Sequence, residues 1–278
     1  MEFVYQRSYR GPLQAVVLDW AGTTVDYGSC APAAVFVAVF RQAGVEITAA
    51  EARGPMGMHK KDHIREVMRL PRVAAAWAEK HGSSPGKADV QQLYEAFTPR
   101  QMAVIVEYAD LIPGTLAAIA DFRQRGLKIG SCTGYTKEMM AVLIPAAAAR
   151  GYAPDEVVCG TDVPAGRPQP WMALVNAMRL GVYPMAAVVK IGDTPADVAE
   201  GLNAGMWTIA VAKTGNEVGL PEAELNNLPA ADRQARLRRA YERLAQAGAH
   251  YVVDGIGDVP AILDEIDARL RRGEHPLG

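Results

Sequence analysis

Short apolar runs recur along the chain, and polar residues or glycines follow each of them. The first run, Ala15–Leu18, ends directly before Asp19. A continuous apolar run of this length is typical of a strand that is buried on both faces of a parallel sheet. Five later runs share the pattern: Leu127–Gly130, Val157–Cys159, Ala187–Ile191, Trp207–Val211 and Tyr251–Val253. These runs predict the strands of a mainly parallel sheet.

Helix-like stretches lie between the predicted strands. They are Pro113–Arg125, Lys137–Arg150, Gln169–Leu180 and Thr194–Ala204. Alternation of strand and helix at this spacing indicates βαβ units. We therefore expect an α/β fold with an open, doubly wound sheet of the Rossmann-like kind.

The interval from residue 31 to residue 101 breaks the alternation, because it contains amphipathic helical patterns and no convincing strand. The helices expected there are Ala33–Ala43, Lys60–Met68, Val73–Lys80 and Val90–Phe97, with a loop at 81–87. We predict a small helical cap domain at 29–101, inserted after the first strand, and a catalytic core at 1–28 and 102–278. The polar, Arg-rich stretch 221–246 predicts a solvated helix.

Composition excludes several classes of protein. The net charge of −2 has acids and bases interspersed, so we expect no nucleic-acid partner. No apolar run approaches the roughly 20 residues needed to cross a bilayer, and the first residues lack the apolar stretch of a signal peptide. Cys30, Cys132 and Cys159 form no CxxC pair, which favours a reducing, cytoplasmic location.

Candidate chemistry gathers at the ends of the predicted strands. Asp19, Thr133 and Asp193 each close a strand, Arg167 follows the third strand, and Asp197 comes one helical turn after Asp193. In open α/β sheets, reactive groups lie outside the carboxyl ends of the strands. Carboxylates bind Mg²⁺, while a hydroxyl and a guanidinium neutralise a phosphoryl group. A carboxylate can also attack phosphorus.

Each of these residues also has a structural interpretation. An aspartate after a strand is often a helix cap or a turn residue. Thr133 alone is more often a turn residue, and Arg167, between a glycine and a proline, would ordinarily lie in a surface loop. Their joint arrangement, in order, at the ends of separate strands favours a site.

These segments resemble the four motifs of the haloacid dehalogenase superfamily: DWAGTTVD at 19–26, the strand ending in Thr133, the basic Arg167, and GDTPAD at 192–197. In phosphotransferases of that superfamily, a second aspartate two residues after the nucleophile is the general acid. Ala21 takes that place here. Because loss of a general acid costs about 10²- to 10⁴-fold in rate, we expect a leaving group that needs no proton there. A carbon leaving group stabilised as an enamine meets this condition.

An enamine requires an electron sink, and a lysine imine can supply it. The segment MGMHKKDH at 56–63 offers Lys60. If the segment is helical, Met56, Lys60 and His63 share one face. A lysine near its reference pKa of about 10.4 cannot attack a carbonyl at neutral pH, so we expect Lys61, nearby histidines and cap closure to lower the pKa. The structural alternative is a solvated Lys/His helix face.

The chain resembles the phosphonoacetaldehyde hydrolase family nearly end to end. Four motifs carry this resemblance: DWAGTTVDYG, PMGxxKxDH, GSxTGYT and DVPAGRPxPW. The resemblance implies hydrolysis of the C–P bond of phosphonoacetaldehyde, in the degradation of 2-aminoethylphosphonate, by a homodimer. It also implies a role for each of the following residues: Asp19 as nucleophile; Lys60 as imine former; Asp19, the Ala21 carbonyl and Asp193 as Mg²⁺ ligands, supported by Asp197; Thr133 and Arg167 as phosphoryl ligands; and Met56, His63 and Tyr135 near the imine.

Three alternatives remain open at this point. A phosphate-ester hydrolase or sugar-phosphate mutase could use the same core, although Ala21 disfavours it. Halide release from a haloacid would not need the metal-type pair Asp193 and Asp197. A catalytically dead regulatory protein is disfavoured because the other catalytic positions are filled.

Overall fold

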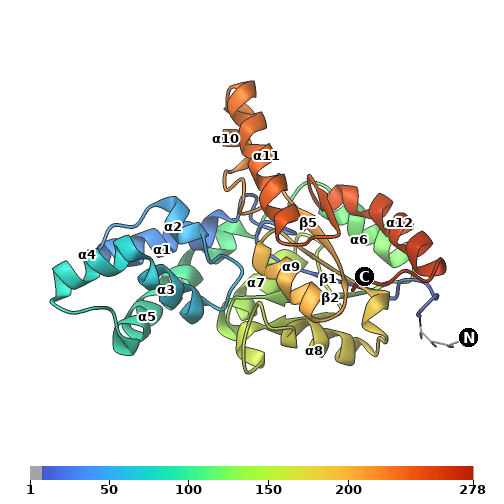
Figure 1. The fold of residues 1–278 in the computed structure, drawn as a ribbon, viewed down its shortest axis with the longest axis horizontal. Helices are drawn as coiled ribbons and strands as arrows, with labels where there is room; N and C mark the ends of the chain where they lie inside the picture. The colour runs from blue at the N-terminus through green and yellow to red at the C-terminus, as the bar shows by residue number, and fades with distance from the viewer. Residues whose placement is uncertain (1–7, 278) are drawn as a thin grey trace, which may run out of the picture.

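A computed structural model describes residues 8–277 and contains one six-stranded sheet (Figure 1). The strand order is β3-β2-β1-β4-β5-β6, and all neighbouring strands are parallel. The strands are β1 Ala15–Leu18, β2 Lys128–Thr133, β3 Glu156–Cys159, β4 Val188–Gly192, β5 Trp207–Val211 and β6 Tyr251–Val253. This arrangement confirms the doubly wound α/β fold.

The strands have the expected apolar character, and one of them extends beyond its apolar run. All four residues of β1 are buried, as expected for a strand that is covered on both faces. The apolar run of the second strand stops at Gly130, but the strand was expected to end at Thr133, and β2 does end there, with residues 131–133 paired with β3. Backbone pairing therefore extends the strand through polar residues that the apolar pattern alone does not include.

Helices cover both faces of the sheet. Val16 and Leu18 face a core that contains side chains of α6, α7 and α12, whereas Ala15 and Val17 face α8. These helices and α9, which packs on β4 and β5, have the bounds α6 Thr115–Gln124, α7 Lys137–Ala148, α8 Trp171–Leu180, α9 Pro195–Asn203 and α12 Val259–Arg271. Short 3-10 helices are η1 Ile105–Tyr108, η2 Gly160–Asp162, η3 Met185–Ala187 and η4 Ile256–Asp258.

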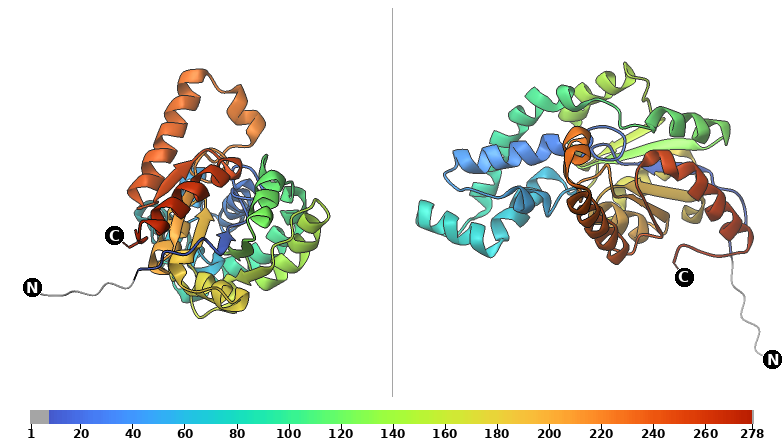
Figure 2. Two further views of the ribbon diagram at one scale, coloured as in Figure 1. Left: turned by 90° about the vertical axis from the view of Figure 1, so that its right-hand side faces the viewer. Right: turned by 90° about the horizontal axis from the view of Figure 1, so that it is seen from above.

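Between β1 and α6 the chain forms a helical insert, residues 30–104, in which the structure has no strand. Its helices are α1 Cys30–Gln42, α2 Ala49–Arg53, α3 Lys60–Arg69, α4 Pro71–His81 and α5 Lys87–Val104. The insert lies at one end of the molecule, opposite α12 (Figures 1 and 2). The boundary predicted at residue 101 falls inside α5, and α2 was not anticipated.

One helix expected near the C-terminus is divided in two. The stretch 221–246 forms α10 Glu222–Asn227 and α11 Ala230–Gln246, and Pro229 separates them. Proline lacks the N–H that a continuing helix needs, which explains the break. Helix α11 projects from the sheet (Figure 1). Within residues 8–277, every helix is too short or too polar to span a membrane.

Candidate active site

A small cavity lies between the carboxyl ends of the strands and the insert. Its free volume is about 20 Å³, which is room for about one water molecule. The lining residues are Asp19, Ala21, Ser29, Pro32, Met56, Gly57, Lys60, Thr133, Gly134, Tyr135, Arg167, Asp193 and Thr194. Both the core and the insert contribute residues to this lining.

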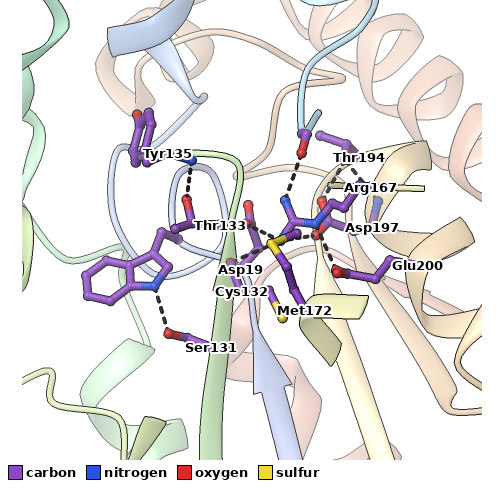
Figure 3. A network of polar contacts seen from close by, with 12 residues as sticks. Asp19, Ser131, Cys132, Thr133, Tyr135, Arg167, Met172, Thr194, Asp197 and Glu200 are labelled. Atoms are coloured by element: carbon purple, nitrogen blue, oxygen red, sulfur yellow. Dashed lines mark hydrogen bonds and ion pairs between the residues drawn. The ribbon is translucent and has the colours of Figure 1, made fainter. Parts of the chain in front are cut away.

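Arg167 is fully buried and reaches Asp19, the residue after β1, so the surface-loop interpretation is wrong. Its Nη2 lies 2.7 Å from Asp19 Oδ1 and donates to the carbonyl of Cys132 at 3.0 Å. Its Nη1 donates to the carbonyl of Gly57, in the insert, at 3.2 Å. Figure 3 shows the guanidinium between Asp19 and Glu200. Arg167 therefore connects the nucleophile candidate, the sheet and the insert.

A layer of buried charges lies beneath Arg167, and the sequence analysis missed two of its members. Arg167 Nε donates to Glu200 Oε2 at 2.9 Å, and Lys190 Nζ lies 2.5 Å from Asp197 Oδ1. Glu200 and Lys190 are almost fully buried. The signal for Lys190 was present, because a lysine inside a buried apolar strand needs charged partners.

Three carboxylates form a cluster that fits a hard cation. Oxygens of Asp19, Asp193 and Asp197 lie within 4.8 Å of one another. Asp193 Oδ1 is buried and has no hydrogen-bond partner within residues 8–277, whereas Oδ2 accepts from the Asn216 N–H at 2.8 Å. Burial, followed by the nearby carboxylates, raises the pKa of Asp193 well above its usual value. A bound divalent cation would relieve this repulsion and satisfy the free oxygen.

Asp197 differs from the other two carboxylates because both of its oxygens have partners. Oδ1 lies close to Lys190 and 3.0 Å from Arg167 Nη2, and Oδ2 accepts from Thr194 Oγ1 at 2.6 Å. The pKa of Asp197 lies below its usual value: burial acts to raise it, and Arg167 and Lys190 lower it. These contacts suit a residue that supports a metal site from behind.

Lys60 is the first residue of α3, and only 3% of it is exposed. Its Nζ lies 4.8 Å from the centre of the Tyr135 ring and 5.7 Å from that of Phe36. Burial lowers the pKa of Lys60 to about 8 against the opposing effect of Asp19. Of the three causes expected, burial against the core is the largest, whereas Lys61, which lines a separate surface pocket, and the histidines are not among the main causes.

The helical arrangement expected for the segment 56–63 was partly wrong. Helix α3 begins at Lys60, so Met56 lies in the preceding turn, although it still lines the cavity. His63 lies behind the cavity, where its ring stacks on Phe36 and Nε2 donates to the carbonyl of Ala52 at 2.7 Å. Burial, and then Lys60, holds the pKa of His63 well below its usual value. His63 is therefore neutral and does not line the cavity.

Thr133 and Tyr135 form the wall at the end of β2. Thr133 Oγ1 accepts from the Tyr135 N–H at 3.1 Å (Figure 3). Between them, Gly134 allows the insert to approach, because a Cβ there would lie 2.4 Å from the carbonyl oxygen of Met58. Gly57 has a φ of +88°, and a Cβ on it would lie 2.4 Å from Thr194 Oγ1. These two glycines permit the close contact between insert and core.

Comparison with known proteins gives a consistent result. A family model described as haloacid dehalogenase-like hydrolase matches residues 13–205. A phosphonoacetaldehyde hydrolase from Syntrophobacter fumaroxidans is 53% identical, with 99% of each chain covered. One from Bacillus cereus is 46% identical, with 92% of this chain and 97% of the relative covered.

Solved structures extend the likeness. The crystal structure of a phosphonoacetaldehyde hydrolase like protein from Oleispira antarctica has a TM-score of 0.96 at 40% identity, with 99% of this chain and 100% of that chain covered. A β-phosphoglucomutase from Clostridium difficile has a TM-score of 0.67 at 16% identity, with 92% and 98% covered. The second likeness concerns the fold alone.

Proposed function

This chain belongs to the haloacid dehalogenase-like hydrolases and, within them, to the phosphonoacetaldehyde hydrolases, and from that premise we propose that it hydrolyses the C–P bond of phosphonoacetaldehyde. The products are acetaldehyde and phosphate. One observation carries the proposal: buried Lys60 and Asp19 line the same small cavity, with Ala21 where an ester hydrolase would have its acid. The arrangement suits a carbon leaving group.

The reaction begins with the imine. Neutral Lys60 condenses with the aldehyde, and water and a protonated imine form. A pKa of about 8 leaves a useful fraction of the amine neutral at physiological pH. The buried Tyr135 and Met56 side chains beside Lys60 exclude bulk water from the imine. His63, neutral and behind Phe36, holds α3 against α2 and tunes proton transfer only through that packing.

C–P cleavage follows. Asp19 attacks phosphorus, the C–P bond breaks, and its electron pair moves into the imine to give an enamine. Arg167 and Thr133 bind the phosphoryl oxygens and stabilise the charge that develops on them. Water then cleaves the aspartyl phosphate, while the enamine is protonated at carbon and the resulting imine is hydrolysed. Lys60 and Asp19 return to their starting forms.

Hydrolases of this family generally use a divalent metal ion, and we assign Mg²⁺ to the carboxylate cluster. Asp19, Asp193 and the carbonyl of Ala21 would hold it, and Asp197 would support them. When bound, the ion neutralises charge on the carboxylates and the phosphoryl group. We also propose that 29–101 acts as a cap domain, which opens for substrate binding and closes for reaction.

The wider setting is proposed from the family alone. The small-molecule substrate arises from 2-aminoethylphosphonate, and the enzyme is a cytoplasmic homodimer that does not bind nucleic acid. Sedimentation of the purified protein tests the dimer.

The decisive experiment is the release of acetaldehyde and phosphate from phosphonoacetaldehyde, with and without Mg²⁺. Equal amounts of the two products, dependent on the metal ion, support the proposal. Borohydride added with substrate should label Lys60, and an active enzyme with unlabelled Lys60 would exclude the imine step. Activity on a hexose phosphate or an alkyl phosphate without C–P cleavage would instead support the ester hydrolase or mutase.

A further inference from the structure

Arg53 and Asn216 form a reciprocal pair of hydrogen bonds between the insert and the core. Arg53 is the last residue of α2, and Asn216 lies in the loop after β5. Arg53 Nη1 donates to Asn216 Oδ1 at 3.1 Å, and Asn216 Nδ2 donates to the main-chain carbonyl of Arg53 at 3.2 Å. Movement of α2 away from the core would break both bonds.

Arg53 also holds the chain where it passes from core to insert. The same Nη1 donates to the carbonyls of Gly28 at 2.8 Å and Ser29 at 3.1 Å. Asp26 and Ser29 have φ values of +54° and +48°, a left-handed conformation that costs roughly 1–2 kcal/mol per non-glycine residue. Such a backbone persists only when surrounding contacts hold it. Arg53 supplies two of those contacts.

On the core side, Asn216 reaches the metal candidate Asp193. Its backbone N–H donates to Asp193 Oδ2 at 2.8 Å, which leaves Oδ1 of that carboxylate without a partner among the described residues. Asn216 therefore binds the insert with its side chain and orients a carboxylate of the site with its backbone. A shift of the loop would change both interactions.

A cavity adjoins the contact between α2 and the loop after β5. Its volume is about 440 Å³, and it is lined by the end of α2, residues 216–220 and two arginines of α11. Beside this cavity, the hydrogen bonds of Arg53 and Asn216 join the end of α2 to the core.

We propose that Arg53 and Asn216 form a closure latch, which keeps the insert closed over the Lys60 cavity and holds Asp193 in its orientation. They act as positioning residues, since neither lines the cavity. That closure serves catalysis rests on the proposed function, whereas the latch itself does not.

The test measures how often the cavity opens, without any substrate. Lys60 is 3% exposed, so trinitrobenzenesulfonate can modify its amine only when the insert opens. Labelling is carried out at one pH, 9, for every variant, so that the exposed amine has the same protonation in each, and is followed by peptide mass spectrometry. Because hydrogen bonds contribute about 1 kcal/mol each, Asn216→Ala, which loses two bonds to Arg53, should raise the labelling rate of Lys60 by about tenfold or more. Arg53→Gln, which loses three side-chain bonds, should raise it further. The double variant should raise the rate by less than the product of the two single effects, because both single variants lose the bond from Arg53 Nη1 to Asn216 Oδ1.

Two controls separate a latch from general loosening. Arg72→Gln breaks a contact between α4 and Glu51 of α2 within the insert, and should leave Lys60 labelling unchanged. Lys190, 1% exposed in β4, reports unfolding of the core. Titration with Mn²⁺ should give several-fold weaker binding in Arg53→Gln than in Arg72→Gln.

An unchanged labelling rate of Lys60 in Arg53→Gln would overturn the latch, and so would an equal rise at Lys190. Because these measurements use no phosphonoacetaldehyde, failure of the proposed reaction would leave a result for the latch intact. Conversely, if the enzyme cleaves phosphonoacetaldehyde but the labelling rate of Lys60 is the same with and without Arg53→Gln, the latch is refuted and the proposed function is not.

Discussion

The Lys60 Nζ lies 4.8 Å from the centre of the Tyr135 ring, and both side chains are buried. The amine belongs to the insert and the ring to the core, so the pair exists only when the two meet. This burial, rather than a neighbouring cation, is the main reason that the pKa of Lys60 falls to about 8.

The lowered pKa predicts how imine formation depends on pH. Only the neutral amine attacks the aldehyde, and its fraction rises with pH until the pKa is passed. The rate of borohydride trapping should therefore rise about tenfold per unit below pH 8 and level off above it. Initial trapping rates between pH 6 and 9.5 measure this. A rate that is flat across the range would contradict a buried amine of pKa about 8.

Substitution of Lys60 should separate activity from stability. Lys60→Arg keeps the charge but cannot form the imine at neutral pH, so turnover should be lost. Lys60→Met should also be inactive, yet more resistant to urea. Lys60 binds its proton less tightly in the folded protein, where its pKa is about 8, than in the unfolded chain, where its pKa is 10.5. The buried charged amine therefore lowers the free energy of unfolding below pH 8, and this loss of stability disappears as the pH rises from 8 to about 10.5.

The gain in unfolding free energy for Lys60→Met should be on the order of 3 kcal/mol near pH 7 and shrink above pH 8. Lys61→Met is the matched control, since Lys61 lines a surface pocket, and its stability should change by less than about 0.5 kcal/mol. Equal effects of the two substitutions would argue against a desolvated Lys60.

Ala21→Asp tests the importance of the missing acid. The new carboxylate would face the cavity near Asp19 and Asp193, where burial and like charge favour its protonated form. Hydrolysis of an alkyl phosphate, whose leaving oxygen needs a proton, should rise by about 10²-fold or more. Phosphonoacetaldehyde cleavage should gain nothing. The measurement is the rate of hydrolysis of both substrates by the original protein and by Ala21→Asp. If the ratio of the two activities does not change, the missing acid does not determine which leaving group the enzyme accepts.

Glu200→Gln tests the buried charge layer. The substitution leaves Arg167 and Lys190 without one of their anionic partners, which should cost about 3–5 kcal/mol in unfolding free energy. The KM for phosphonoacetaldehyde should rise as well, because Glu200 orients the Arg167 guanidinium. Glu156→Gln, at an exposed pair 3.5 Å from Arg179, should cost less than about 1 kcal/mol. Urea unfolding of both variants gives the comparison.

Most of the fold could be predicted from the local pattern. Apolar runs located all six strands within a few residues, because strands buried on both faces need continuous apolar sequence. The pattern failed where tertiary contacts decided the outcome. Pairing with β3 extended β2 to Thr133, and α2 is too short to give a clear helical period. Met56 was assigned to a helix that begins only at Lys60.

The site shows the same division between sequence and tertiary structure. Motif spacing brought Asp19, Arg167 and Asp193 together, since the carboxyl ends of parallel strands share one edge of the sheet. It could not reveal Glu200 or Asn216, whose roles depend on which side chain lies opposite them.

By itself, the sequence determined the fold class, the family and the identities of the reactive groups, because these follow from local periodicity and from residues at fixed spacing. Only the tertiary structure decided that Lys60 is desolvated, that Arg167 is buried, and that Asn216 touches both the insert and Asp193. A pKa or an ion pair depends on the atoms that surround a group in space, and those atoms come from distant parts of the chain.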